Sequence, residues 1–298
     1  MIWGDKNLAI VGGDAREIVL IQELVHKGYS LRVFGFPVNM IPKQVQVCST
    51  VSEAVTGARV VILPMPGIKD NRQLYTKYMP SGVKVEKEDF SGIGSGACVF
   101  VGVASGYLKS LAKLFSFHLV EIVEQDMVAI PNSIPTAEGA IQLAMEKMPI
   151  TIHGAKVLVI GFGRVADTLA FTLKGLGANV TVAARNPAQL AKCCVLGYQV
   201  VELNNLAKYI GEADLIYNTV PAPVLGEKML NQVKKDVLII DLASSPGGTD
   251  FPAAENLGVT AVLAPGLPGK VAPITAGKIL ARVYPPFIDS WLSRCTDG

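Results

Sequence analysis

A glycine-containing turn in the second half of the chain constrains the fold more than any other feature of the sequence. The apolar run Lys156–Ile160 is followed at once by Gly161-Phe162-Gly163-Arg164-Val165-Ala166, where helical spacing begins. In a G-x-G-x-x-A turn between a strand and a helix, the first glycine permits the bend and the second lets the backbone approach a pyrophosphate. Free N–H groups at the start of the helix favour phosphate binding. The turn therefore predicts a Rossmann-type dinucleotide site.

The end of the next strand bears on the choice of cofactor. An NAD site usually has an acidic residue there, which binds the ribose 2′-hydroxyl, but this strand ends in Ala183-Ala184-Arg185. The guanidinium of Arg185 is suited to a 2′-phosphate, which it can bind as a bidentate fork. We therefore predict NADP rather than NAD, with a solvated Arg185 as the alternative.

Further strand ends are expected to line the same site, because ligands of open α/β sheets bind beyond the carboxyl ends of the strands. The predicted cofactor contacts in these turns are Thr219, Val220 and Pro221, then Asp241, Leu242 and Ala243, and finally Pro265 and Gly266. Each turn also fits an ordinary connection rich in proline and glycine.

Short apolar strands alternate with helical stretches along the chain, which predicts parallel sheets with right-handed crossovers. At roughly 150 residues per domain, 298 residues suggest two domains. The predicted fold class is α/β, with two open parallel-sheet Rossmann-like domains joined by a long hinge helix. The expected limits are 1–125 for a substrate/catalytic domain, 126–150 for the hinge region and 151–272 for the NADP-binding domain. Residues 273–298 are expected to form helices that pack back on the first domain, with an interruption at Pro285-Pro286.

The first half also begins like a nucleotide-binding fold, with Gly12-Gly13-Asp14-Ala15-Arg16 after a strand, but it lacks the G-x-G-x-x-G spacing. Asp14 would place a carboxylate where a pyrophosphate should lie. We therefore expect substrate binding here, by Gly12, Gly13, Asp14 and Arg16, since backbone amides and a guanidinium can hold a carboxylate. The alternative is that Asp14 caps the helix and Arg16 lies in solvent.

The hinge segment adds further candidates. A helix is expected to begin near Ser133, so Asn132, Ser133 and Thr136 are predicted to face the substrate in the cleft between the domains, or to cap the helix. Glu138, in the expected first turn, is a candidate acid or base, although acidic residues are common there because of the helix dipole. Asp14 is the second candidate, and the catalytic group is not identified.

Charge and residue usage exclude several classes of protein. A net charge of +2 gives no case for binding nucleic acid. The mean hydropathy of +0.39 is high, but the apolar runs are strand-sized, so no membrane span is predicted. The start, Met1–Lys6, has no signal-peptide pattern, which favours the cytoplasm.

Cysteine and histidine spacing predicts no metal site, and the cysteines are expected to be free, buried thiols. They are Cys48, Cys98, Cys193, Cys194 and Cys295. The absence of histidine after residue 153 argues against D-2-hydroxyacid dehydrogenases, and no G-x-S-x-G elbow supports a hydrolase.

Six stretches spread over nearly the whole chain carry a more specific signal. They are Ile10–Arg16, Asn132–Gly139, Thr151–Gly154, Gly161–Arg164, Asp241–Asp250 and Ala264–Pro273. Together they resemble the A subunits of dipicolinate synthase from endospore-forming bacteria. Lys270 departs from the apolar residue expected in that family and is given no catalytic role.

The resemblance implies NADP-dependent oxidation of a small dicarboxylate, dihydro- or 4-hydroxytetrahydro-dipicolinate, to pyridine-2,6-dicarboxylate in the mother cell during sporulation. It also implies a flavoprotein-like B subunit as partner, and a homo-oligomer is expected as well. Two alternatives stay open. One is another two-domain NAD(P) dehydrogenase, of the alanine or methylene-tetrahydrofolate dehydrogenase kind, and the other is a non-catalytic NADP-binding subunit.

Overall fold

The computed structural model describes residues 7–294, which form two compact units. Unit 1 comprises the described residues up to Pro131 and those from Ala272 onward, and unit 2 comprises Asn132–Val271. The predictions for Met1–Lys6, for Cys295 and for the last residues of the C-terminal segment fall outside the described residues.

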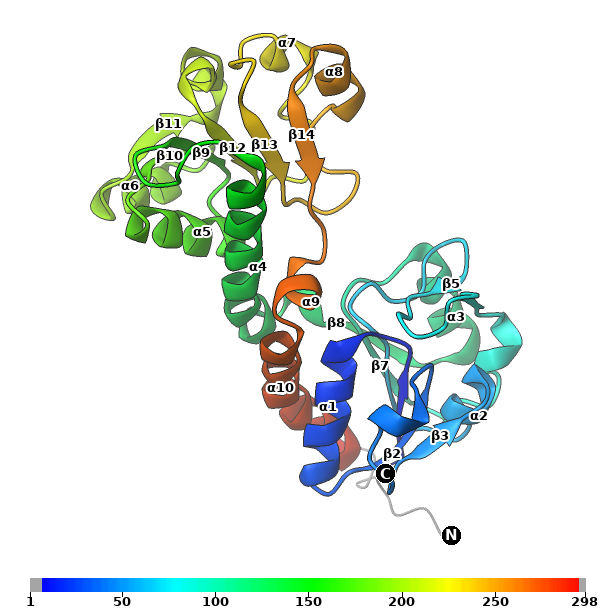
Figure 1. Cartoon of the computed structure of the whole chain (residues 1–298). Helices are drawn as coiled ribbons and strands as arrows, with labels where there is room; N and C mark the ends of the chain where they lie inside the picture. The colour runs from blue at the N-terminus through cyan, green and yellow to red at the C-terminus, as the bar shows by residue number, and fades with distance from the viewer. Residues whose placement is uncertain (1–6, 295–298) are drawn as a thin grey trace. The chain divides into compact units, whose positions relative to one another are not determined.

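Unit 1 is built on a parallel six-stranded sheet in the order β3-β2-β1-β4-β7-β8 (Figure 1). Its strands are β1 (Asn7–Val11), β2 (Ser30–Phe34), β3 (Gln46–Cys48), β4 (Val60–Ile62), β7 (Cys98–Val101) and β8 (His118–Glu121), and a separate antiparallel hairpin contains β5 (Gln73–Leu74) and β6 (Val83–Lys84). Its helices are α1 (Ala15–His26), α2 (Val51–Val55), α3 (Gly106–Phe115) and α10 (Pro273–Arg294), with 3-10 turns η1 (Val38–Met40), η2 (Lys87–Phe90) and η3 (Ile122–Glu124).

Alternate residues of β1 enter two different cores, one on each face of the sheet. Leu8 and Ile10 belong to the core that also contains α1 and α10 side chains, and Ala9 and Val11 belong to the core beside α2 and α3. A parallel sheet covered on both faces needs strands that are apolar throughout. This covering accounts for the high mean hydropathy of the chain.

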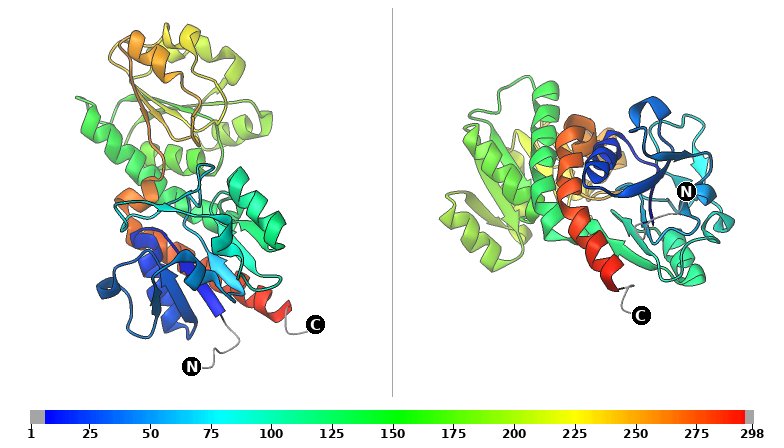
Figure 2. Two further views of the ribbon diagram at one scale, coloured as in Figure 1. Left: turned by 90° about the vertical axis from the view of Figure 1, so that its right-hand side faces the viewer. Right: turned by 90° about the horizontal axis from the view of Figure 1, so that it is seen from below.

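The last helix, α10, packs against α1 within unit 1 (Figure 2). It runs without a break through Pro285-Pro286, so the predicted interruption is wrong. Each proline lacks an N–H donor and so removes one bond from the helix. The burial of Tyr284, Ile288 and Leu292 in the unit 1 core offsets that loss.

Unit 2 repeats the arrangement, with a parallel six-stranded sheet in the order β11-β10-β9-β12-β13-β14. Its strands are β9 (Lys156–Ile160), β10 (Asn179–Ala184), β11 (Gln199–Glu202), β12 (Leu215–Asn218), β13 (Leu238–Asp241) and β14 (Thr260–Leu263). Its helices are α5 (Arg164–Gly175), α6 (Pro187–Val195), α7 (Glu227–Leu230), α8 (Phe251–Asn256) and α9 (Leu267–Val271), with 3-10 turns η4 (Leu203–Lys208) and η5 (Ile210–Glu212). The predicted fold class of two open, parallel α/β sheets is confirmed.

Helix α4 (Asp126–Lys147) crosses the boundary between the units along the chain. It begins at Asp126 and not near Ser133, because Pro131 and Pro135 lie inside the helix and do not end it. Proline usually breaks a helix interior, but the buried side chains of Val128 and Ala137 lie on either side of this stretch. Tertiary packing therefore overrides the local signal.

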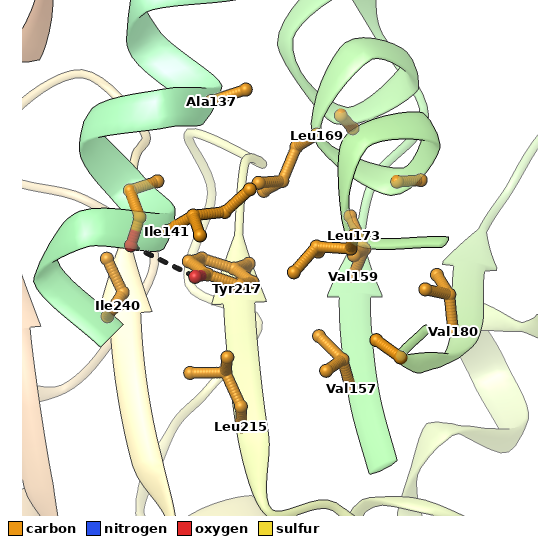
Figure 3. Close-up of a cluster of buried hydrophobic side chains, with 14 of the residues drawn as sticks. Ala137, Ile141, Val157, Val159, Leu169, Leu173, Val180, Leu215, Tyr217 and Ile240 are labelled. Carbon is orange, nitrogen blue, oxygen red and sulfur yellow. Dashed lines mark hydrogen bonds between the residues drawn. The ribbon is translucent and has the colours of Figure 1, made fainter. Parts of the chain in front are cut away.

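The C-terminal part of α4 is anchored to the sheet of unit 2 (Figure 3). Ala137 and Ile141 pack with Leu169 and Leu173 of α5 in one buried cluster. The hydroxyl of Tyr217, on β12, donates a 3.0 Å hydrogen bond to the Ala140 carbonyl. Burial raises the pKa of Tyr217, so the phenol remains a donor throughout the ordinary pH range.

Among residues 7–294, no helix is long and apolar enough to cross a membrane, and no group of three or more histidine, cysteine or acidic side chains could hold a metal ion. Cys48, Cys98 and Cys193 are buried and form no disulfide bond, as predicted. Cys194 is exposed, contrary to expectation, because the helical turn from Cys193 points it outward.

The Tyr217 bond gives a first prediction. Tyr217→Phe keeps the ring in the core but removes the donor to Ala140, so we expect the free energy of unfolding to fall by about 1 kcal/mol. Urea unfolding measures this loss. Tyr209→Phe is the control, since Tyr209 is 48% exposed, and an equal loss in both variants would contradict the anchoring role.

Candidate functional site

The turn after β9 requires glycine at its first position. Gly161 has a φ of +95°, and a Cβ added there would lie 2.3 Å from the Thr219 hydroxyl oxygen. That hydroxyl is fixed in turn, because it donates a 2.8 Å bond to the Ile160 carbonyl. The bend and the close approach of two strand ends therefore exclude a side chain at Gly161.

The second glycine of the turn leaves the start of α5 open. Gly163 is the N-cap of α5, and no side chain caps the helix at this end. A Cβ built on Gly163 would meet nothing within 4 Å. The N-terminal N–H groups of a helix that are not capped attract an anion, and Ala166 is fully buried where the helix packs closely on the sheet. The turn therefore fits a dinucleotide pyrophosphate.

The other predicted residues of this turn are also placed. Phe162 is buried against Tyr198, with ring centroids 6.3 Å apart, and its carbonyl accepts a 2.9 Å bond from the Gln189 side chain. Arg164 and Val165 are half-buried in the first turn of α5. Phe162 therefore shapes the turn through packing, while the backbone of the turn remains the part that suits phosphate.

The carboxyl ends of β9 and β12 meet where the strand order of the sheet reverses, since β9 has β10 on one side and β12 on the other. Open α/β sheets bind ligands at this switch point. Thr219 and Val220 lie there, half-buried, beside Gly161, and Pro221 follows them exposed. Arg185 comes directly after β10 and is exposed.

Asp241 lies at the predicted strand end, but its side chain is fully buried. Its carboxylate accepts hydrogen bonds from the Asn218 amide, the Thr249 hydroxyl and the N–H groups of Ala243 and Gly248, at 2.7–3.0 Å. The expectation of a direct cofactor contact by this carboxylate is therefore revised: Asp241 holds the loop that follows β13.

The remaining predicted contacts of unit 2 differ in accessibility. Leu242 is half-buried and Ala243 is buried in the loop held by Asp241. Pro265 and Gly266 are exposed after β14. The exposed pair and the half-buried Leu242 are the members of this set whose side chains or backbone are accessible to a ligand.

In unit 1, Asp14 is the N-cap of α1 and is paired with Arg16. The Nε and Nη2 atoms of Arg16 each donate a 2.9 Å bond to the carboxylate of Asp14. Burial opposes ionisation of Asp14, but the bonds and charge of Arg16 outweigh it and lower the pKa of Asp14. Arg16 is buried, so the alternative of a solvated arginine is wrong, and its fork is occupied by the chain's own carboxylate.

Two members of this cluster, Glu17 and Tyr75, are not among the residues predicted from the sequence. Glu17 is fully buried and accepts the Asp14 N–H at 2.8 Å, completing a capping box. The Tyr75 hydroxyl donates a 3.1 Å bond to Asp14, and burial raises the pKa of Tyr75 to about 12. The D-x-x-E spacing of Asp14 and Glu17 is a capping-box signal, whereas nothing local in the sequence connects Tyr75 with Asp14.

The glycines of the first turn are covered by the segment 74–77. A Cβ on Gly12 would lie 2.7 Å from the Tyr75 carbonyl oxygen, and the Gly13 carbonyl accepts a 2.9 Å bond from the Lys77 N–H. The N–H groups of Asp14 and Arg16 are bound by carboxylates of Glu17 and Asp14. A substrate anion at the start of α1 would therefore compete with internal bonds.

The hinge candidates lie inside α4 and do not cap it. The Ser133 hydroxyl is buried against the Thr168 hydroxyl at 2.6 Å, and Thr136 donates back to the Asn132 carbonyl at 2.8 Å. Glu138 is exposed in the middle of α4 and not in a first turn. The predicted caps are wrong because α4 begins earlier, and Ser133 faces α5.

Two families match the chain. Residues 7–123 match the N-terminal domain of the dipicolinate synthase A subunit, and residues 128–295 match the alanine dehydrogenase/PNT, C-terminal domain.

Relatives resemble the chain over nearly its whole length. The dipicolinate synthase A subunit of Bacillus subtilis (strain 168) is 36% identical in an alignment 296 residues long, which covers 95% of this chain and 95% of that protein. The crystal structure of the dipicolinate synthase A subunit from Bacillus halodurans has a TM-score of 0.90 at 34% identity and covers 97% of this chain and 99% of that one. The crystal structure of the Bacillus subtilis protein has a TM-score of 0.88 at 35% identity, with 96% and 97% covered.

The two glycines of the β9–α5 turn give a paired prediction. Gly161→Ala strains the backbone and meets Thr219, so it should cost about 2 kcal/mol of unfolding free energy and abolish dinucleotide binding. Gly163→Ala should leave stability nearly unchanged, because its methyl meets nothing within 4 Å. It should weaken dinucleotide binding, because the methyl enters the space predicted for the pyrophosphate. Thermal unfolding and calorimetric titration with NADP⁺ measure both effects. Full binding by Gly161→Ala would refute the assigned site.

Proposed function

Because the chain belongs to the family of dipicolinate synthase A subunits, we propose that it is the NADP-dependent component that oxidises dihydro- or 4-hydroxytetrahydro-dipicolinate to pyridine-2,6-dicarboxylate. The resemblance seen in the six sequence stretches is confirmed. The family match also makes the chain an oxidoreductase with a nicotinamide cofactor. The open start of α5 behind Gly161 and Gly163 is the observation that carries the proposal, because it fits the cofactor that this oxidation needs.

We propose a division of labour between the two units. In unit 2, the N–H groups at the start of α5 bind the pyrophosphate, Arg185 binds the 2′-phosphate, and Thr219, Val220, Leu242, Pro265 and Gly266 line the site. When bound, the nicotinamide supplies the acceptor for the hydride that leaves the substrate. In unit 1, the turn Gly12–Arg16 at the carboxyl end of β1 binds the substrate.

The protein's main tasks in this reaction are to position the substrate and to remove one proton beside the hydride, because aromatisation of the ring supplies driving force. A 4-hydroxytetrahydro substrate also loses its hydroxyl group as one molecule of water before the ring becomes aromatic. Asp14 and Glu138 remain the candidates for the proton acceptor. The lowered pKa of Asp14 keeps it ionised at neutral pH but also makes it a weak base. Its pairing with Arg16 suits orientation of a polar substrate better than proton abstraction.

We also propose the partners and setting that the family implies. A flavoprotein-like B subunit would form the complete synthase with this chain. This chain would also form a homo-oligomer. The synthase would act in the cytoplasm of the mother cell during sporulation. The named relative is itself an A subunit.

Reconstitution tests the function directly. The purified chain, a B subunit, NADP⁺ and freshly formed precursor should together yield dipicolinate, followed by its ultraviolet absorbance, and Gly161→Ala should abolish the yield. No product with both subunits present would refute the proposal. NADP⁺ binding without hydride transfer would favour a non-catalytic subunit, and activity on alanine in a substrate panel would favour another dehydrogenase.

Cofactor choice has a test of its own. Arg185→Ala should weaken NADP⁺ binding about tenfold or more and leave NAD⁺ binding nearly unchanged, since only NADP⁺ carries the 2′-phosphate. Calorimetric titration gives both affinities. Lys235→Ala, an exposed charge before β13, is the matched control. If Arg185→Ala had the same ratio of NADP⁺ affinity to NAD⁺ affinity as the wild type, Arg185 would have no role in cofactor choice.

A further inference from the structure

Glu17 is a buried acidic residue that the proposed reaction does not use. It lies in the first turn of α1 with 1% of its surface exposed. Acidic side chains are almost never fully buried unless they are paired. Capping of a helix end at the protein surface therefore does not account for a buried acidic residue beside the candidate substrate-binding turn.

The local backbone is shaped around the Glu17 carboxyl group. Its Oε2 accepts the Asp14 N–H at 2.8 Å, and a Cβ added to Gly13 would lie 2.5 Å from the same oxygen. Gly13 therefore leaves the space that the carboxyl group fills. This arrangement fixes the backbone of Asp14, whose own carboxylate holds both Nε and Nη2 of Arg16.

The groups around Glu17 come from three elements of unit 1. Asp14 and Arg16 belong to the same end of α1. Tyr75 and Tyr78 face it from the segment that covers the Gly12-Gly13 turn. Tyr284 faces it from α10. Arg16 is the cation among these groups, and it is already bound bidentately by Asp14.

We propose that Glu17 is a positioning residue of the substrate site: its buried carboxyl group holds the Asp14–Arg16 pair in place and sets the net charge beside the bound dicarboxylate. This role rests on the proposed function, because it assumes that a dicarboxylate binds at the turn Gly12–Arg16.

The charge on this cluster changes in the neutral range. Burial raises the pKa of Glu17 to about 7, and the charge of Arg16 only partly opposes it. Below that pH the cluster holds one carboxylate and one guanidinium, and above it a second carboxylate is ionised. Because a dianion is repelled by the added charge, dicarboxylate binding weakens as the pH rises through 7.

The same shift fixes the sign of a stability effect. The folded-state pKa of Glu17, about 7, exceeds the ordinary value of 4.5, so the folded chain holds a proton that the unfolded chain has released. The stabilisation is complete below pH 4.5 and is lost as the pH rises through 7. Glu17→Gln, which stays neutral and keeps an acceptor for the Asp14 N–H, removes this dependence.

Titration with pyridine-2,6-dicarboxylate tests the role without requiring turnover. Between pH 6 and 8.5 the wild-type dissociation constant should rise about tenfold, while in Glu17→Gln it should stay within about twofold. Glu23→Gln, on the same helix, should behave like the wild type. Thermal unfolding gives a second readout, the unfolding temperature of Glu17→Gln minus that of the wild type. This difference should be about 5 °C larger at pH 8 than at pH 5, because only the wild type is destabilised as the pH rises.

A second variant separates positioning from charge. Glu17→Ala removes the acceptor for the Asp14 N–H, so it should weaken dicarboxylate binding at every pH, whereas Glu17→Gln should restore it. The role of Glu17 would be overturned if dicarboxylate binding by Glu17→Gln kept the pH dependence of the wild type. It would also be overturned if Glu17→Ala bound the dicarboxylate as tightly as the wild type does. Failure of the wild type to bind the dicarboxylate at any pH would instead refute the proposed substrate, and with it this role.

Discussion

The reversal of strand order beside a central strand is the constraint on which both units depend. In unit 2, β9 lies between β10 and β12, and in unit 1, β1 lies between β2 and β4. At such a point the connections leave in opposite directions, and the carboxyl ends of the strands are open to a ligand. The turn with Gly12 and Gly13 follows β1, and the turn with Gly161 and Gly163 follows β9, so both lie at this position. The topology therefore fixes where a ligand can bind, and the side chains determine which ligand can bind there.

The start of the following helix differs between the two units. At α5, no side chain caps the helix and Gly163 leaves open space. At α1, the N–H groups of Asp14 and Arg16 are bound by the chain's own carboxylates. An anion at the start of α5 meets no competing side-chain cap, whereas an anion at the start of α1 must compete with the carboxylates of Asp14 and Glu17. This difference explains in physical terms why one of two sheets with the same strand order is suited to a pyrophosphate.

Features encoded by neighbouring residues could be predicted from the sequence, and features that depend on distant partners could not. The alternation of strands and helices and the turn at Gly161 are local, and both are present as expected. The sequence predicts a helix that begins near Ser133 and an interruption at Pro285-Pro286, but α4 begins at Asp126 and α10 is continuous, because core packing outweighs the bonds lost at the prolines. Ser133 could not be placed without Thr168 of α5, nor Asp14 without Tyr75. Glu17 was within reach, since its spacing from Asp14 is a capping box.

The two acidic residues at strand ends show how a preformed site reduces the cost of binding. Asp241 is fully buried, and charge-assisted bonds from neutral donors compensate its desolvation. One of these donors, the Asn218 amide, belongs to the end of β12, so a single carboxylate ties together the loops after β12 and β13. Asp14 does the same for α1 and the segment containing Tyr75. Each edge is therefore rigid before a ligand arrives, and less conformational entropy is lost on binding.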